Sequence, residues 1–340
     1  MIGEGKKSGS FGLLITLLAI TFIVIVTFLL SSRVKESQKI GEPRAAISLT
    51  QTCTFTKNWG TQGSGDGQFN NHFGVAVTTS GGNLWVADAE NFRIQKFTSE
   101  GRFQSKFGSQ GTGDSQFDKA FGISLKGADY VYVSDTWNNR IQKFNLFGGF
   151  VNKWGSEGTG DGQFSKPFGI ATDSRGNVYV ADTFNNRIQK FDANGKFITK
   201  WGSFGSGNGQ FNEPHGVAVD AQNKVYVTDY LNHRVQIFTD SGIFISSWGE
   251  GQGDGNYQFN LPTGIAIKKN EGAVYIADTY NHRIKKYDTR GKLYAIFGTY
   301  GSGDAQFKFP RGVGVDETVN IFVSDSQNYR MVKFWCPPIK

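Results

Sequence analysis

A motif of the form D-x-x-N-x-R recurs six times along the chain, and its spacing constrains the fold more than any other feature. Its arginines are Arg93, Arg140, Arg187, Arg234, Arg283 and Arg330. Successive arginines are 47, 47, 47, 49 and 47 residues apart. A fixed period of roughly 20–50 residues is typical of arrays that repeat one supersecondary unit. We therefore interpret the chain as six copies of one structural unit.

Two further motifs recur six times in step with the first. One, G-x-G-[DN]-x-Q-F, ends at Phe69, Phe117, Phe164, Phe211, Phe259 and Phe307. The other, an aromatic residue followed by glycine, begins at Trp59, Phe107, Trp154, Trp201, Trp248 and Phe297. The chain has 45 glycines, 14% aromatic residues and only 7 prolines, a composition typical of short strands joined by tight turns.

Each unit has the pattern of four short strands. In one copy, residues 168–173 and 178–182 are largely apolar, whereas residues 187–192 and 196–201 alternate between polar and apolar side chains. Gly, Asn, Asp and Ser lie at the predicted turns, and no stretch has a helical period. Six such units predict an all-β fold, a six-bladed β-propeller of four-stranded antiparallel blades.

The repeated residues resemble the NHL-repeat family. Its pattern, G-[IV]-A-x-D followed by [VL]-Y-[VI]-[AS]-D-T-x-N-[HN]-R-[IV], covers the chain from residue 55 to about residue 335. Residues 232–235 and 281–284 carry the namesake Asn-His element, with Val or Ile in place of Leu. The resemblance implies a six-bladed propeller that serves mostly for binding. The Trp-Asp dipeptide of WD40 blades is absent from the sequence.

The two ends of the repeat region are complementary. Residues 53–60 align with a fourth strand, whereas the last repeat stops after its third strand at residues 330–334. We therefore expect the N-terminal strand to complete the last blade and close the ring.

The two cysteines of the chain lie at this closure. In the repeat alignment Cys336 falls on Ala193 and Cys53 on Gly195, two positions that face each other across one hairpin turn. Their Cα atoms are expected to be roughly 5–7 Å apart, within the range of a disulfide. We therefore predict a Cys53–Cys336 disulfide, with two free thiols as the alternative.

The N-terminal region has the features of a membrane anchor. Residues 11–30 are apolar, and no charge lies between Lys7 and Arg33. Twenty residues of helix are about 30 Å long, the thickness of a bilayer core. We predict a tail over residues 1–10, a transmembrane helix over residues 11–30, a polar stalk over residues 31–52 and the propeller over residues 53–340. A cleaved secretory signal is the alternative.

Two features of the sequence disagree about orientation. Two lysines precede the apolar segment and four basic residues follow it, which by itself would place the propeller in the cytoplasm. A structural disulfide requires an oxidising compartment, and large domains translocate largely regardless of flanking charge. We therefore expect a single-pass membrane protein whose propeller lies outside the cytoplasm.

The recurring motifs are best explained as scaffold. The Asp of D-x-x-N-x-R ends one strand and the Arg begins the next, so the two are expected to pair around a turn that suits Asn. The G-x-G-[DN]-x-Q-F loops lack the following helix and the Lys-Ser/Thr of a phosphate-binding loop. Function is therefore expected where the six repeats differ.

Two variable positions are expected at the mouth of the central channel. The residues before the glycine of the first strand are Phe73, Phe121, Phe168, His215, Thr263 and Arg311. Aromatic residues in the loop after the motif Asp are Trp137, Phe184 and Tyr280. Aromatic anchors with a few polar groups suit a protein, peptide or glycan ligand, so we predict a binding site here. The alternative is that these side chains only fill the channel.

The sequence favours a binding module over an enzyme, and we assign no catalytic residue, metal or cofactor. Some related propellers are lyases with a zinc held by histidines, so a metal-dependent lyase or hydrolase remains the first alternative. The chain has four histidines, of which His233 and His282 occupy a repeated turn position. The net charge of +7 is spread along the repeats without a basic-aromatic cluster, so no nucleic-acid partner is expected. An RNA-binding propeller is the second alternative.

Overall fold

The computed structural model describes residues 49, 51–78, 82–127 and 129–339. The predicted tail, the predicted transmembrane helix at residues 11–30 and nearly all of the predicted stalk lie outside the described residues. Within the described part, no helix is long and apolar enough to cross a membrane.

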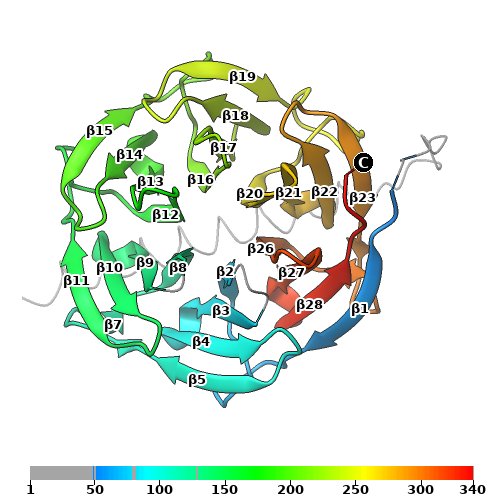
Figure 1. Ribbon diagram of the computed structural model, residues 1–340, viewed down its shortest axis with the longest axis horizontal. Helices are drawn as coiled ribbons and strands as arrows, with labels where there is room; N and C mark the ends of the chain where they lie inside the picture. The colour runs from blue at the N-terminus through cyan, green and yellow to red at the C-terminus, as the bar shows by residue number, and fades with distance from the viewer. Residues whose placement is uncertain (1–48, 50, 79–81, 128, 340) are drawn as a thin grey trace, which may run out of the picture. The chain divides into compact units, whose positions relative to one another are not determined.

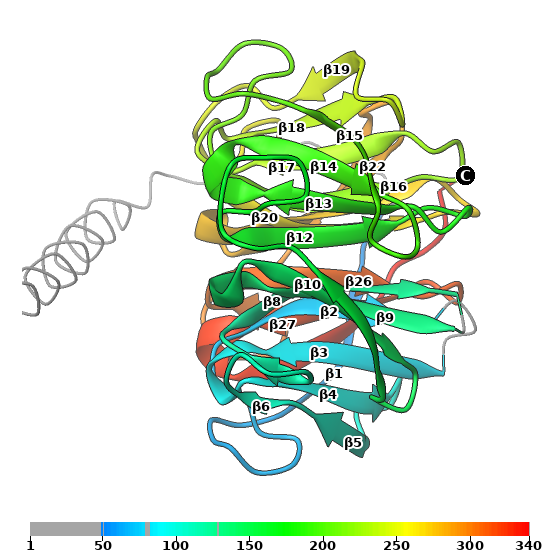
Figure 2. The same ribbon diagram turned by 90° about the vertical axis from the view of Figure 1, so that its left-hand side faces the viewer.

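The described chain folds into a six-bladed β-propeller, as predicted (Figure 1). Six antiparallel sheets of four strands surround a central axis, and in each sheet the strands follow one another from the axis to the rim. In the view turned by 90°, the strands run between two opposite faces of the ring and the connecting loops lie at those faces (Figure 2).

The strands fall into four concentric sets. The innermost are β2 (His72–Val77), β8 (Ala120–Lys126), β12 (Pro167–Thr172), β16 (Pro214–Val219), β20 (Pro262–Lys268) and β26 (Pro310–Val315). The second are β3 (Asn83–Asp88), β9 (Tyr130–Asp135), β13 (Val178–Asp182), β17 (Val225–Asp229), β21 (Ala273–Asp278) and β27 (Asn320–Asp325). The third are β4 (Arg93–Thr98), β10 (Arg140–Asn145), β14 (Arg187–Phe191), β18 (Arg234–Phe238), β22 (Arg283–Asp288) and β28 (Arg330–Trp335). The outermost are β5 (Phe103–Phe107), β11 (Phe150–Trp154), β15 (Phe197–Trp201), β19 (Phe244–Trp248), β23 (Leu293–Phe297) and β1 (Thr54–Trp59).

Short elements complete the loops. Two small parallel pairs are formed by β6 (Ser109–Gln110) with β7 (Gln116–Phe117), and by β24 (Thr299–Tyr300) with β25 (Gln306–Phe307). The turn between the second and third strands forms a 3-10 helix at η1 (Ala89–Asn91), η2 (Thr136–Asn138), η3 (Thr183–Asn185), η4 (Thr279–Asn281) and η5 (Ser326–Asn328).

The ring closes as the repeat alignment predicts. β1 pairs antiparallel with β28, so the N-terminal strand is the outermost strand of the last blade (Figure 1). The predicted disulfide between Cys53 and Cys336 is present and joins residues 283 positions apart in the chain. The Cα atoms of the two cysteines are 4.3 Å apart, closer than the roughly 5–7 Å expected for facing positions of a hairpin.

Hydrogen bonds hold the D-x-x-N-x-R motif and the G-x-G-[DN]-x-Q-F loop together. The Nε of Arg187 donates to Oδ2 of the fully buried Asp182 at 2.6 Å. The other guanidinium nitrogens donate to the carbonyl oxygens of Thr159, Gly160 and Gln163 in the preceding loop. The motifs are therefore scaffold, because one buried ion pair holds both the turn of a blade and the loop that leads into that blade.

Glycine sets how closely the innermost strands approach. A Cβ atom on Gly312 would lie 1.9 Å from the carbonyl oxygen of Phe73, and one on Gly169 would lie 2.3 Å from that of His215. Both distances are far inside van der Waals contact, so only a residue without a side chain fits. Because the strands approach so closely at these glycines, the residue before each of them lies in the wall of the central channel.

Candidate ligand-binding site in the central channel

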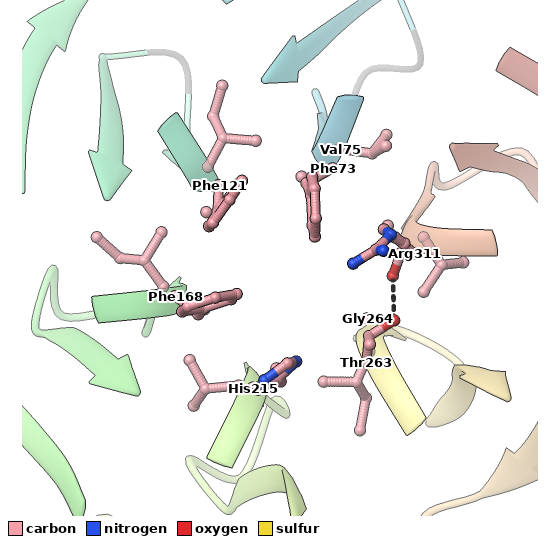
Figure 3. Close-up of a pocket in the computed structure, with 18 residues that line it drawn as sticks. Phe73, Val75, Phe121, Phe168, His215, Thr263, Gly264 and Arg311 are labelled. Atoms are coloured by element: carbon pink, nitrogen blue, oxygen red, sulfur yellow. Dashed lines mark hydrogen bonds between the residues drawn. The ribbon is translucent and has the colours of Figure 1, made fainter. Parts of the chain in front are cut away.

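The six residues expected at the channel lie together in its wall (Figure 3). They are Phe73, Phe121, Phe168, His215, Thr263 and Arg311. The channel cavity has a volume of about 90 Å³. One water molecule needs about 10–15 Å³ on this scale. The channel therefore has room for a small chemical group or the end of a chain.

Three phenylalanines form one side of the wall. The ring centroids of Phe73 and Phe121 are 4.2 Å apart, and those of Phe121 and Phe168 are 4.8 Å apart. Figure 3 shows these rings side by side around the open centre. This side offers apolar contact and no hydrogen bond to a ligand.

The other side of the wall carries His215. Its ring stacks on Phe168 at 4.6 Å and on Tyr230 at 4.0 Å, almost parallel to the latter. Burial, together with the nearby Arg311 guanidinium, lowers the pKa of His215 to about 3. His215 is therefore a neutral, stacked ring at neutral pH.

Thr263 is less available to a ligand than the sequence suggested. Its hydroxyl donates to the carbonyl oxygen of Arg311 at 2.9 Å (Figure 3). The same hydroxyl lies 2.6 Å from the hydroxyl of Thr279. The bond to Arg311 joins two adjacent blades, whereas the contact with Thr279 lies within one blade. The hydroxyl thus helps to position Arg311.

Tyr230 is part of this site and was missed from the sequence. It follows the motif Asp of the fourth blade and stacks on His215. At the equivalent position the other repeats have Ala89, Thr136, Thr183, Thr279 and Ser326. The sequence therefore distinguishes Tyr230, because it is the single bulky residue at a position where the other five repeats have a small one.

The three aromatic residues predicted in the adjoining loops do not line the channel cavity. Trp137 on η2 and Phe184 on η3 are 48% and 54% exposed. The Lys166 ammonium lies 4.5 Å from the centre of the Trp137 ring. Tyr280 on η4 packs edge-on against Phe309 and interacts with Tyr230.

These loops nevertheless share the channel's end of the propeller. Asp182, immediately before η3, pairs in register with Pro167, immediately before the channel residue Phe168. The N–H of Phe184 also donates to the carbonyl oxygen of Ser165 in the same region. Trp137 and Phe184 are thus exposed aromatic side chains at the mouth, and the strand-start residues line the channel.

The other histidines lie outside the channel lining and serve the scaffold. Nδ1 of His233 accepts a hydrogen bond from the N–H of Leu261 at 3.1 Å. The side-chain oxygen of Asn186 accepts from the N–H of Glu213 in the same way. Among the described residues, no group of three or more His, Cys, Asp or Glu side chains is arranged to hold a metal.

His72 makes the stability of the fold sensitive to acid. It is buried at the start of β2, in the position held by proline in four other blades, and its Nε2 donates to the carbonyl oxygen of Arg330 at 2.9 Å. Burial lowers its pKa from an ordinary value of about 6.5 to about 3. On acidification, His72 therefore takes up a proton in the unfolded chain before it does so in the folded chain. The free energy of unfolding consequently decreases as the pH falls from about 6.5 towards 3.

We expect the His72→Pro variant to lose less stability on acidification than the native protein. The measurement is thermal unfolding at pH 7 and at pH 4. If the unfolding temperature falls by the same amount between pH 7 and pH 4 in both proteins, His72 does not contribute to the acid sensitivity.

The sequence matches the family described as NHL repeat over residues 74–97, 164–191, 211–238 and 259–287. A segment of 58 residues is 38% identical to the Protein brain tumor of Drosophila melanogaster, covering 17% of this chain and 6% of that protein. The match thus spans a small part of that relative's length.

Solved structures share the fold at low sequence identity. A Bacteroides thetaiotaomicron protein of unknown function has a TM-score of 0.66 at 14% identity, covering 84% of this chain and 76% of that one. Virginiamycin B lyase from Staphylococcus aureus has a TM-score of 0.56 at 14% identity, covering 82% and 98%. At such identity the likeness establishes architecture alone. The chain is a six-bladed β-propeller that carries NHL repeats.

Proposed function

We propose that this protein is a non-enzymatic binding module that recognises a peptide segment of a protein ligand at the mouth of the propeller channel. The observation that carries the proposal is the placement of the variable residues. The six blades share one scaffold, yet they differ where their strand-start residues meet in the channel wall. Exposed aromatic side chains on η2 and η3 border the same end.

The dimensions favour a peptide over a bulky ligand. The channel cavity of about 90 Å³ accepts only a small group. The exposed rings of Trp137 and Phe184 offer flat apolar surface for the part of a ligand that remains outside. Aromatic residues of this kind dominate the binding energy of many interfaces.

We further propose that residues 11–30 tether the propeller to a membrane and that the propeller lies outside the cytoplasm. The proposal rests on the apolar sequence of residues 11–30 and on the disulfide between Cys53 and Cys336. Structural disulfides persist in oxidising compartments.

We expect the Trp137→Ala/Phe184→Ala variant to lose affinity for captured peptides by about tenfold or more, because two exposed anchors are removed. The measurement is capture of a random peptide pool by the immobilised full-length protein, quantified by mass spectrometry. The matched control is Phe147→Ala, which removes an equally apolar side chain, 93% exposed, from the turn between β10 and β11. Equal capture by all three proteins would refute binding at the mouth.

A further inference from the structure

Arg311 is a cation in the central channel of the propeller. It lies near the start of β26 and points into the channel, where its guanidinium carbon is 4.3 Å from the centre of the Phe73 ring (Figure 3). It also borders a second, polar hollow, which is lined by Asn70, Asn71, Ser326, Gln327 and Tyr329. Arg311 is therefore reachable both from the channel and from the mouth.

Arg311 has no anionic partner among the described residues. The arginine of each D-x-x-N-x-R motif has its Nε within 2.6–2.8 Å of its own Asp. By contrast, no described carboxylate lies within 4.0 Å of Arg311, and its Nε is buried without a hydrogen-bond partner. Burial lowers the pKa of Arg311. A desolvated cation without an anionic partner is costly to the fold, and costly features of this kind cluster at functional sites.

The surroundings of Arg311 suit a carboxylate. Tyr230 and Tyr280 lie near enough to interact with the guanidinium and with each other, and their phenol groups can donate hydrogen bonds. His215 is neutral and adds no competing charge. A guanidinium presents paired N–H groups in one plane, which match the two oxygens of a carboxylate.

We propose that Arg311 binds a carboxylate group of the ligand inside the channel, with Tyr230 and Tyr280 beside it. The inference rests on the proposed function and specifies which group of the ligand enters the channel. The phenylalanine side of the wall contacts the apolar stem that carries the carboxylate. Such a group is found at the C-terminus of a peptide and on small organic acids, and the experiment below separates these two sources.

The first arm uses a small probe and the purified full-length protein in detergent. We expect 3-phenylpropionate to bind about tenfold more tightly than 3-phenylpropionamide, because the amide lacks the charge that pairs with Arg311. In the Arg311→Met variant, which keeps an unbranched apolar side chain but removes the guanidinium, this preference should disappear. Titration calorimetry or ligand-observed NMR gives both affinities.

The second arm uses two random peptide pools that differ only in a free or an amidated C-terminus. Preferential capture of the free-acid pool by the native protein, but not by Arg311→Met, identifies a peptide C-terminus as the source. Binding of 3-phenylpropionate without capture of either pool identifies a small organic acid, and refutes the proposed peptide function while leaving the carboxylate site intact. If both pools are captured equally through Trp137 and Phe184, and Arg311→Met has no effect, the carboxylate site is refuted and the proposed function stands.

A stability measurement separates a binding role from a structural one. If Arg311 is kept for a ligand, Arg311→Met should unfold at the same or a higher temperature than the native protein when no ligand is present, because an unpaired buried charge is removed. A clearly lower unfolding temperature would assign Arg311 to the scaffold and overturn the proposal.

Discussion

The Asp182→Ala variant is expected to lose about 3–5 kcal/mol of unfolding free energy, the cost of breaking a buried ion pair by removing one partner. Oδ2 of Asp182 accepts hydrogen bonds from Arg187, Asn185 and Gln189, and its Oδ1 accepts one from the N–H of Ser165. The substitution leaves the buried Arg187 guanidinium without its counter-charge. It also releases the loop that Arg187 holds. Denaturant unfolding followed by tryptophan fluorescence measures the loss.

The matched control is Asp161→Ala in the same loop. Asp161 forms an ion pair of 2.7 Å with Lys200, but both side chains are largely exposed to solvent. Exposed pairs contribute about 0–1 kcal/mol, so this variant should unfold close to the native protein. A loss at Asp182 no larger than the loss at Asp161 would contradict the assignment of the motif as the lock of the blade.

Replacing both cysteines, as in Cys53→Ser/Cys336→Ser, is expected to destabilise the propeller by about 2–5 kcal/mol. The disulfide closes a loop of 283 residues and joins the two segments that complete one blade. Without it, ring closure depends on the pairing of β1 with β28 alone. The measurement is the midpoint of thermal unfolding with and without a reductant.

The two proteins should respond differently to reduction. The native protein should gain the mass of two hydrogen atoms and unfold at a lower temperature, whereas the double variant should be insensitive to the reductant. A native protein whose mass and unfolding temperature do not change on reduction would show that the thiols are free. That result would also remove the argument for an extracytoplasmic propeller.

Most of the fold could be predicted from the sequence because the strands and turns of each repeat are specified by short-range patterns within that repeat. The strands, the turns and the pairing of Asp182 with Arg187 depend on residues close together in one unit, and six copies made the pattern unmistakable. Ring closure was also predictable. A unit that lacks its fourth strand leaves an unpaired edge, and residues 53–60 are the matching strand.

The candidate site was only partly predictable. The column of strand-start residues was identified because the glycine after each of them recurs, and the structure places all six in one wall. Trp137 and Phe184 were expected at the mouth of the channel, and their side chains are exposed there, outside the lining of the channel cavity. Tyr230 was overlooked, although the other five repeats have a small residue at its position.

The sequence by itself determined the number of blades, the strands within each blade, the scaffold role of the motifs and the partner of Cys53. These features depend on short-range patterns and on a period that can be counted. Only the tertiary structure decided that Arg311 has no counter-charge, that His215 is stacked and neutral, and that the hydroxyl of Thr263 is already engaged. Those properties depend on how the blades pack around the channel, which brings together side chains of one blade, such as His215 and Tyr230, and side chains of neighbouring blades about 47 residues apart.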